Sequence, residues 1–177
     1  MIYYFKPFDL DKKLGRAYNE YMRMLPSDED WGCLLDGDTM FLTEDYGKQI
    51  QEIVMMYPNT GLFTCLTNRV GRRQQCYKGV MSENWDIKHH YQIAQEVQKF
   101  ARHNVSEIHT IISGHLLLVK KKTWREVGGF VEEGILKVDN KFSWGILQAR
   151  KKILIMNGVY IFHRYRINGI KFREHLK

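Results

Sequence analysis

Proline, cysteine and long apolar runs are all scarce in this chain of 177 residues. With three prolines and no stretch rich in serine, proline and glycine, the sequence has no candidate linker, and residues 1–177 are expected to form a single domain. The three cysteines, Cys33, Cys65 and Cys76, form no Cys-x-x-Cys pair, which argues against a disulfide scaffold and against structural zinc. No run approaches the roughly 18 apolar residues of a membrane-spanning helix. These absences predict a cytoplasmic protein, with a peripheral position at a membrane surface as an alternative.

Negative charge is also in short supply. Lysine and arginine total 27 against 20 for aspartate and glutamate, which gives a formal charge of +7 and a pI of about 9.3. A basic surface suits an anionic partner such as a nucleotide, a nucleic acid or a lipid headgroup, and the charge alone does not choose among them. A hydrophobic content of 44% is ordinary for a globular domain and excludes intrinsic disorder.

The spacing of apolar residues predicts strands and helices that alternate along the chain. Short apolar or aromatic runs bounded by turn residues predict strands at 2–5, 31–35, 61–67, 115–120, 153–156 and 159–163. Helical spacing predicts helices at 11–25, 45–56, 86–102, 121–130 and 139–151. The connection between 102 and 115 has no clear pattern. This alternation favours a three-layer α/β fold with a mostly parallel central sheet flanked by helices.

Three Asp-x-Asp pairs occur, and their surroundings differ. Asp9/Asp11 lies where the first helix should begin, so its simplest interpretation is capping of that helix. Asp28/Asp30 lies in "PSDED", which reads as a solvated turn. Asp36/Asp38 directly follows the apolar run "WGCLL", and in α/β sheets ligands bind beyond the carboxyl ends of such strands.

Asp36 and Asp38 are therefore the candidate metal ligands. In an extended backbone, residues i and i+2 point to the same side, so the two carboxylates can share one cation, and Gly37 leaves room for a ligand. Mg²⁺ and Mn²⁺ accept carboxylate and phosphate oxygens together. The alternative is a strand-end turn in which both carboxylates cap nearby amides.

Downstream of this "DGD" come "SGHLLLVKKKTWREVGGFVEEG", "VDNKF" and "YIFHRYR", in that order. This succession resembles the family 2 glycosyltransferases, whose nucleotide-binding fold is called GT-A. In that family an Asp-x-Asp strand is followed by a glycine that opens a strand, a helix with a Val-Gly-Gly-Phe turn, an acidic catalytic base and often a late histidine. The resemblance implies a GT-A-like fold that is shortened at the N-terminus, because one strand–helix unit before the Asp-x-Asp strand is missing.

The resemblance also implies roles for single residues. Asp36 and Asp38 would bind Mn²⁺ or Mg²⁺ and the nucleoside diphosphate-sugar donor, and His163 would complete the metal site; for a lone histidine, an ordinary hydrogen-bonded role is the alternative. Asp139 would be the general base, with capping of the following helix as the alternative and Glu132 and Glu133 as competitors for the role.

Lys13 and Asn19 match residues that approach the nucleotide in the family, and Gly114 lies where the strand entry lines the donor sugar. Pro7 and Phe8, at the end of the first strand, are expected to replace the base contacts of the missing unit, with the Phe8 ring available for stacking. Trp124 and the Gly128–Phe130 turn are expected to build the fold. Basic residues that could hold phosphate or acceptor charge, or simply be solvated, are Arg69, Arg72, Arg73, Arg164 and Arg166.

The leading hypothesis is a metal-dependent, inverting glycosyltransferase that acts on a hydroxyl acceptor of a glycan, a lipid-linked sugar or a protein. A metal-dependent nucleotidyltransferase also needs paired aspartates, but "DLDKKLG" is not a phosphate-gripping glycine-rich loop. A basic nucleic-acid-binding module is the non-enzymatic alternative, because "YIFHRYRINGIKFREHLK" interleaves aromatic and basic residues.

Overall fold

The computed structural model describes residues 1–132, 134 and 137–164. Its strands are β1 (Ile2–Phe5), β2 (Trp31–Leu35), β3 (Thr39–Phe41), β4 (Leu62–Thr67), β5 (Val105–Ile108), β6 (Leu116–Lys120) and β7 (Ile153–His163). Its helices are α1 (Leu14–Met24), α2 (Tyr46–Met56), α3 (Ile87–Ala101), α4 (Lys121–Glu126) and α5 (Val138–Gln148), with short 3₁₀ turns at Arg73–Gln75 and Tyr77–Gly79. Among the described residues, no helix is both long and apolar enough to cross a bilayer.

The strands form one seven-stranded sheet in the order β1-β2-β6-β4-β7-β3, and β5 also pairs with β7. β1 is parallel to β2 and β4 is parallel to β7, whereas β6 is antiparallel to both β2 and β4. It follows that β1, β2, β4 and β7 all run in one direction, while β3, β5 and β6 run against them. The predicted α/β fold with a mostly parallel sheet is confirmed in this sense, and only β1 and α1 precede β2.

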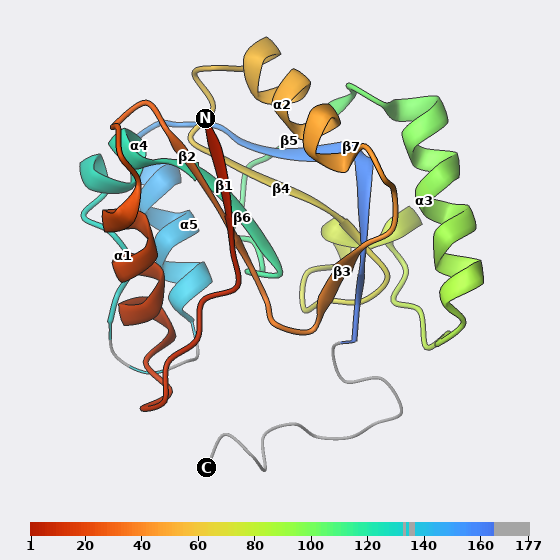
Figure 1. Cartoon of the computed structure of the whole chain (residues 1–177), viewed down its shortest axis with the longest axis horizontal. Helices are drawn as coiled ribbons and strands as arrows, with labels where there is room; N and C mark the ends of the chain where they lie inside the picture. Colours follow the sequence, from red (N-terminus) through yellow and green to blue (C-terminus); the bar gives the residue numbers. More distant parts are fainter. Residues whose placement is uncertain (133, 135–136, 165–177) are drawn as a thin grey trace.

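Alternating side chains of the central strands feed two separate cores. Leu34, Leu117 and Val119 point to the face covered by α1, α4 and α5, and pack there with residues such as Tyr18 and Phe142. Their neighbours along the strands point to the other face, where α2 contributes Ile50, Ile53 and Val54. Because both faces are buried, β2 and most of β6 read as continuous apolar runs rather than alternating ones. Figure 1 shows the sheet between these two groups of helices.

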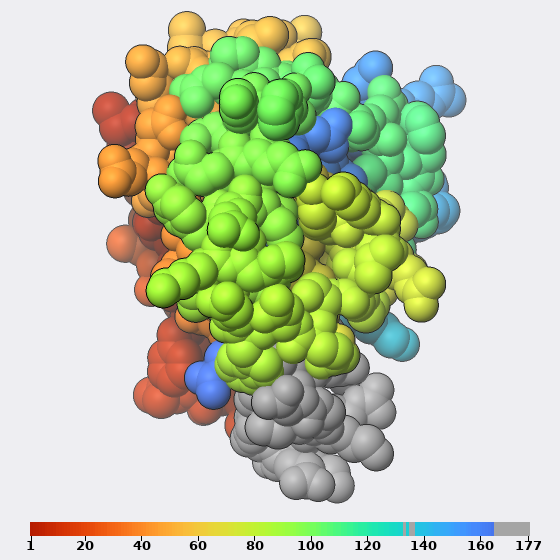
Figure 2. Space-filling view, turned by 90° about the vertical axis from the view of Figure 1, so that its right-hand side faces the viewer, coloured from red at the N-terminus to blue at the C-terminus, as the bar shows by residue number. Residues whose placement is uncertain are grey.

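β7 is the longest strand, and it was predicted as two strands, 153–156 and 159–163. Its pairing with β4 shifts between Cys65 and Leu66, whose partners are Met156 and Tyr160. The irregularity marks a change of neighbour, because the first part of β7 pairs with β5 and the last part pairs with β3. A Cβ on Gly158 would lie 2.5 Å from the carbonyl oxygen of Ala101, so the end of α3 packs directly on this bulge. Figure 2 shows α3, in green, over the centre of this side of the molecule.

The other two Asp-x-Asp pairs have structural partners. Asp9 Oδ1 accepts hydrogen bonds from the backbone amides of Asp11 and Lys13 in the turn before α1, and Asp9 Oδ2 accepts one from Arg16 of the helix. The N-cap residue of α1 is Lys13, with no side-chain cap, so the predicted capping of the helix by this pair was wrong. Asp28 pairs with Arg125 at 2.8 Å and its side chain is 46% exposed, as expected for a solvated turn. Asp30 is different, because it is buried and its carboxylate accepts a hydrogen bond from the Ser27 amide. The prediction of a fully solvated turn was therefore wrong for Asp30.

Candidate metal and nucleotide site

The turn between β2 and β3 presents Asp36 and Asp38 at the carboxyl edge of β2. The Asp36 amide donates to the His115 carbonyl at the start of β6, and the Asp36 carbonyl accepts from the amide and the hydroxyl of Thr39. Thr39 is opposite His163 in the β3–β7 ladder, and the Arg164 amide donates to the Asp38 carbonyl at 3.1 Å. This register brings the last residue of β7 to the Asp36–Asp38 turn.

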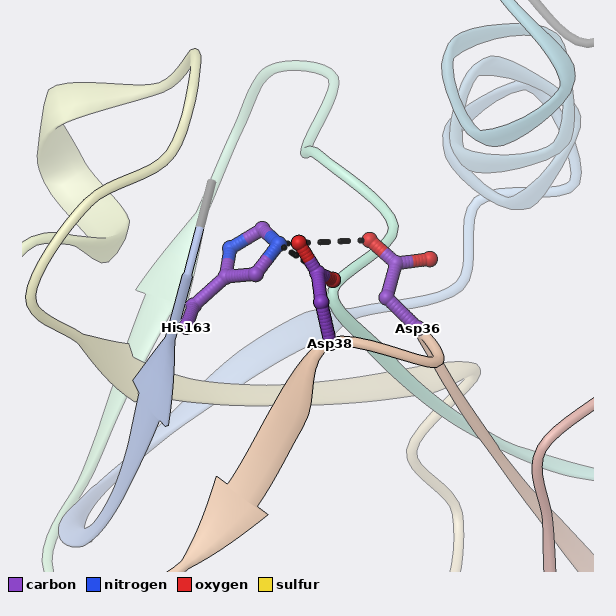
Figure 3. A group of neighbouring side chains, drawn as sticks. All are labelled: Asp36, Asp38 and His163. Atoms are coloured by element: carbon purple, nitrogen blue, oxygen red, sulfur yellow. Dashed lines mark ion pairs between the residues drawn. The ribbon is translucent and has the colours of Figure 1, made fainter. Parts of the chain in front are cut away.

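The three side chains converge on one point (Figure 3). His163 Nε2 lies 3.2 Å from Asp38 Oδ1 and 3.7 Å from Asp36 Oδ2. One ligand atom from each residue lies within 4.8 Å of the others, a separation that a single cation can bridge. The His163 side chain is 2% exposed, whereas those of Asp36 and Asp38 are 33% and 44% exposed, so solvent reaches the carboxylates and not the imidazole.

The second ring nitrogen of His163 fixes the orientation of the imidazole. Nδ1 lies 2.9 Å from the Arg69 carbonyl, to which it must donate, and the backbone of His163 makes two hydrogen bonds with the Asn68 amide side chain. With Nδ1 as the donor, Nε2 of a neutral ring is an acceptor that faces carboxylate acceptors. Such a contact needs a cation between the two, either a proton or a metal ion. An outer hydrogen bond from the distal nitrogen to a backbone carbonyl is typical of metal-ligating histidines.

The pKa values of the two carboxylates shift in opposite directions. Desolvation, together with the charges of Asp38 and Asp139, raises the pKa of Asp36 from 3.8 to about 6, although His163 and a hydrogen bond with Tyr18 oppose the rise. Desolvation also acts to raise the pKa of Asp38, but the hydrogen bond and charge of His163, with help from Lys6, outweigh it and the pKa is lowered. Both carboxylates are thus ionised near neutral pH and available to a cation.

Lys6 is a site residue that the sequence analysis missed. It follows β1, and its ammonium group donates to the Thr39 carbonyl at 2.8 Å and to the Gly37 carbonyl at 3.4 Å. It therefore ties the end of β1 to the Asp36–Asp38 turn and supplies a positive charge beside Asp38. A lone lysine after a strand gives no signal in the sequence, because its partners are backbone carbonyls more than thirty positions away.

His115, which the sequence analysis left without a role, lies directly beneath the cluster. Its ring is fully buried and stacks on the ring of His163 with centroids 6.0 Å apart. Nε2 lies 3.1 Å from the Cys65 carbonyl, and desolvation with the charge of His163 lowers the pKa of His115 to about 3. His115 is therefore a neutral packing surface for the imidazole of His163.

Asp139 lies in the first turn of α5, one residue inside the helix, on the same side of the sheet as Tyr18. Its Oδ2 accepts from the Gly114 amide at 2.9 Å and its Oδ1 from the Asn140 amide at 2.8 Å. Desolvation raises its pKa, against the effect of these amides and of Arg72. The charge of Asp139 acts on Asp36, so the two predicted site residues are electrostatic neighbours.

Gly114 is required by close approach rather than by a special backbone conformation. A Cβ at this position would lie 3.0 Å from Asp139 Cβ, which is tighter than most contacts of this kind. Gly114 was predicted to line the donor sugar, and the structure gives it a contact with the predicted base. Pro7 and Phe8 follow β1, which is parallel to β2, so they lie at the same edge of the sheet as Asp36; Phe8 is 75% exposed.

Asn19 and Lys13 were predicted to approach the nucleotide. Asn19 is buried; its Nδ2 donates to the Phe130 carbonyl and to Glu132, and its Oδ1 accepts from Trp124 Nε1 and the Phe130 amide. These contacts use all four hydrogen-bonding positions of the amide, so Asn19 holds the Gly128–Phe130 turn and has none left for a nucleotide. Lys13 is the exposed residue before α1.

The same contacts weigh against Glu132 as the base. Hydrogen bonds from Asn19 and Arg23 lower its pKa, whereas burial raises that of Asp139. A carboxylate with a raised pKa is the better proton acceptor near neutral pH. The remaining competitor, Glu133, lies outside the described residues, as does Arg166.

The basic loop after β4, residues 68–79, reaches the site through the Arg69 carbonyl, which contacts the His163 imidazole. Gln75 is buried and links the loop to Ser113 twice, by donating to its carbonyl and accepting from its amide. A Cβ on Gly71 would lie 3.4 Å from Ser113 Oγ, so the backbone before Arg72 lies against Ser113, which precedes β6. Arg69 pairs with Glu83, and Arg164 lies over the Trp85 ring.

Comparison with solved structures identifies the kind of fold that this chain has. The mixed α/β sheet with its flanking helices is similar to a glycosyltransferase nucleotide-binding fold. A particular solved structure with this similarity is the mannosyltransferase PcManGT from Pyrobaculum calidifontis in complex with GDP-Man and Mn²⁺, with a TM-score of 0.51 and 16% sequence identity. The alignment covers 90% of this chain and 39% of the mannosyltransferase chain, so this chain spans well under half of that protein. No protein-family model and no curated protein sequence matches the chain.

Proposed function

We propose that this protein is a metal-dependent glycosyltransferase that moves a sugar from a nucleoside diphosphate-sugar to a hydroxyl acceptor. The observation that carries the proposal is the cluster of Asp36, Asp38 and His163 at the carboxyl edge of the sheet. The fold similarity to a mannosyltransferase solved with GDP-Man and Mn²⁺ supports the same class of reaction. Sugar, nucleotide base and acceptor are left open by this proposal.

The residues fit a divalent cation. Two carboxylates and an imidazole offer oxygen and nitrogen donors, and the imidazole favours Mn²⁺ over Mg²⁺. When bound, a divalent ion supplies a Lewis acid that stabilises the charge on a departing diphosphate. The ion would be held by Asp36, Asp38 and His163. Lys6 fixes the Asp36–Asp38 turn, and the backbone carbonyl of Arg69 orients the imidazole of His163.

Asp139 is the proposed general base. It would take the proton of the acceptor hydroxyl while that oxygen forms a bond to the anomeric carbon of the donor. The bond between the anomeric carbon and the diphosphate oxygen breaks, and its electron pair leaves with the nucleoside diphosphate. A direct displacement of this kind inverts the anomeric configuration. Two of the acceptor positions of the Asp139 carboxylate are used by backbone amides, and a carboxylate has about four, so it can still receive the proton.

Ligand-induced stabilisation tests the proposal directly. A panel of nucleoside diphosphates with Mn²⁺ should raise the midpoint of thermal unfolding for at least one base, because a ligand that binds only the folded state stabilises it. Asp38→Ala should abolish that gain. Asp28→Ala is a matched control, since it removes an aspartate of another Asp-x-Asp pair at an exposed position. An unchanged Mn²⁺-dependent shift in Asp38→Ala would refute the site.

The base is tested separately. Asp139→Asn should keep Mn²⁺-dependent nucleotide binding and lose sugar transfer, because the amide cannot accept the proton. Transfer at the original rate would move the role to Glu133 or to solvent.

The nucleic-acid-binding alternative loses its main support in the described part of its segment. Tyr160 and Phe162 are buried, with 3% and 6% exposure, so these aromatics are not available for stacking on bases. Steep loss of nucleic-acid binding with salt, without any effect of Mn²⁺ and nucleotide, would restore that alternative.

A further inference from the structure

The arginines of the described chain differ in whether a carboxylate forms an ion pair with them. Those that form an ion pair with a carboxylate are Arg16, Arg23, Arg69, Arg102 and Arg125. Across the described residues, no carboxylate lies within ion-pair distance of Arg72, Arg73, Arg150 or Arg164. Of these four arginines only Arg72 is partly buried, so its charge has given up part of its hydration without gaining an ion-pair partner. An external anion would supply that partner.

The backbone of Arg72 is held in place, which makes it a built position rather than a mobile loop. Its carbonyl accepts a hydrogen bond from the Gln75 amide at 3.0 Å and lies 3.9 Å from Cys76 Sγ. Gln75 in turn is fixed to Ser113 by two hydrogen bonds. The preceding Gly71 lies against Ser113 as well.

These contacts put Arg72 on the side of the site where Asp139 lies. Ser113 is followed by Gly114, whose amide donates to Asp139 Oδ2. In agreement, the charge of Arg72 acts on Asp139, whereas the lysine or histidine charges that act on Asp38 are those of His163 and Lys6. The diphosphate of a donor belongs with the metal ligands, so a cation beside the base is positioned for the acceptor.

From this arrangement we infer that the acceptor carries a phosphate monoester close to the hydroxyl that is glycosylated, and that Arg72 binds it with help from Arg73. A guanidinium matches phosphate oxygens with two parallel hydrogen bonds. A phosphate monoester carries a charge of about −1.5 to −2 at neutral pH, which the guanidinium groups of two consecutive arginines can balance more fully than they could the single charge of a carboxylate. This inference rests on the proposed function, and it names the class of acceptor at the same site.

The phosphate could belong to a soluble sugar phosphate or to a lipid, and one experiment separates the two. The full chain, loaded with Mn²⁺ and its stabilising nucleoside diphosphate, is titrated with glucose, with glucose 6-phosphate, and with vesicles of phosphatidylcholine with or without phosphatidic acid. Glucose 6-phosphate or the phosphatidic acid vesicles should bind at least about tenfold more tightly than their uncharged counterparts. Arg72→Met should remove that preference, and Arg72→Lys should keep part of it, since lysine retains the charge without the fork.

Arg150→Met is the matched control. Arg150 is exposed and precedes β7 at the opposite end of the strand from His163, so its loss removes the same charge far from the site. Preference for glucose 6-phosphate alone identifies a soluble acceptor, and preference for the charged vesicles alone identifies a lipid-borne phosphate.

Equal binding of charged and uncharged probes would overturn the inference, as would unchanged selectivity in Arg72→Met. Weaker Mn²⁺-dependent nucleotide stabilisation in Arg72→Met would also overturn it, by assigning Arg72 to the donor. Failure of the proposed function looks different: no nucleoside diphosphate would stabilise the unmodified protein with Mn²⁺.

Discussion

Substituting asparagine for the two neighbouring aspartates should change stability in opposite directions. The fold raises the pKa of Asp36 from 3.8 to about 6, so the ionised carboxylate destabilises the folded state above that range. A rise of this size corresponds to about 3 kcal/mol, and because the side chain is 33% exposed, screening by solvent reduces the expected effect to about 1 kcal/mol. For a chain of this length, Asp36→Asn should therefore raise the unfolding midpoint by about 2–4 °C at pH 8 without divalent cations.

The pH dependence follows from the same shift. Below pH 3.8 the carboxyl is protonated in both the folded and the unfolded state, and Asp36→Asn should have no advantage there. The advantage should grow as the pH rises to about 6 and stay constant above it. For Asp38 the sign reverses: its pKa is lowered by His163, so its charge stabilises the fold and Asp38→Asn should lower the midpoint at pH 8.

Thermal unfolding followed by circular dichroism, in buffers from pH 4 to 8 with a chelator, measures both effects. Adding Mn²⁺ and nucleotide should then make the unmodified protein more stable than Asp36→Asn, because the unmodified protein gains stability from the ligand and a variant that lacks one of the two carboxylates gains little. A stability difference that does not depend on pH would refute the electrostatic reasoning, even if ligand binding were lost.

Three further outcomes can be checked by unfolding and activity measurements. Asn19→Ala should destabilise the fold by about 3–5 kcal/mol, because the Trp124 indole and the Phe130 backbone lose buried partners; a loss of nucleotide binding at full stability would restore its predicted donor role. Gly114→Ala should lower transfer more than nucleotide binding, since its Cβ would push on Asp139, and equal transfer by the variant would argue against Asp139 as the base. His115→Asn should flatten the loss of stability between pH 6.5 and 3, because the neutral histidine must be protonated on unfolding; an unchanged slope would mean that another group causes it.

The sequence predicted the helices and strands that have a buried face, because their apolar residues recur at regular intervals. Helix α2 is an example: a helix was predicted at 45–56, and Ile50, Ile53 and Val54, which lie at helical spacing there, are all buried. Strands β3 and β5 were not predicted, because each is short and only partly buried, so their residues carry no clear alternation. Both are held by β7, a partner distant in the sequence.

The sequence predicted which residues form the candidate metal cluster, but not how they come together. The order of motifs selected Asp36, Asp38 and His163, and the structure brings these three together. The contact depends on the pairing of Thr39 with His163, a long-range register that no local pattern encodes. The role of Asn19 was unpredictable for a similar reason, since all its partners lie more than one hundred positions away.

The irregularity in β7 works as a spacer of fixed length. Before it, Met156 is locked opposite Cys65, and after it, Tyr160 is locked opposite Leu66. Since side chains alternate along a strand, removing one residue from the spacer would either break the second ladder or turn the imidazole of His163 to the opposite face. The number of residues between the two ladders, more than their identity, thus decides whether the His163 imidazole faces the carboxylates. A one-residue deletion there should abolish metal binding at the cluster while leaving most of the core intact.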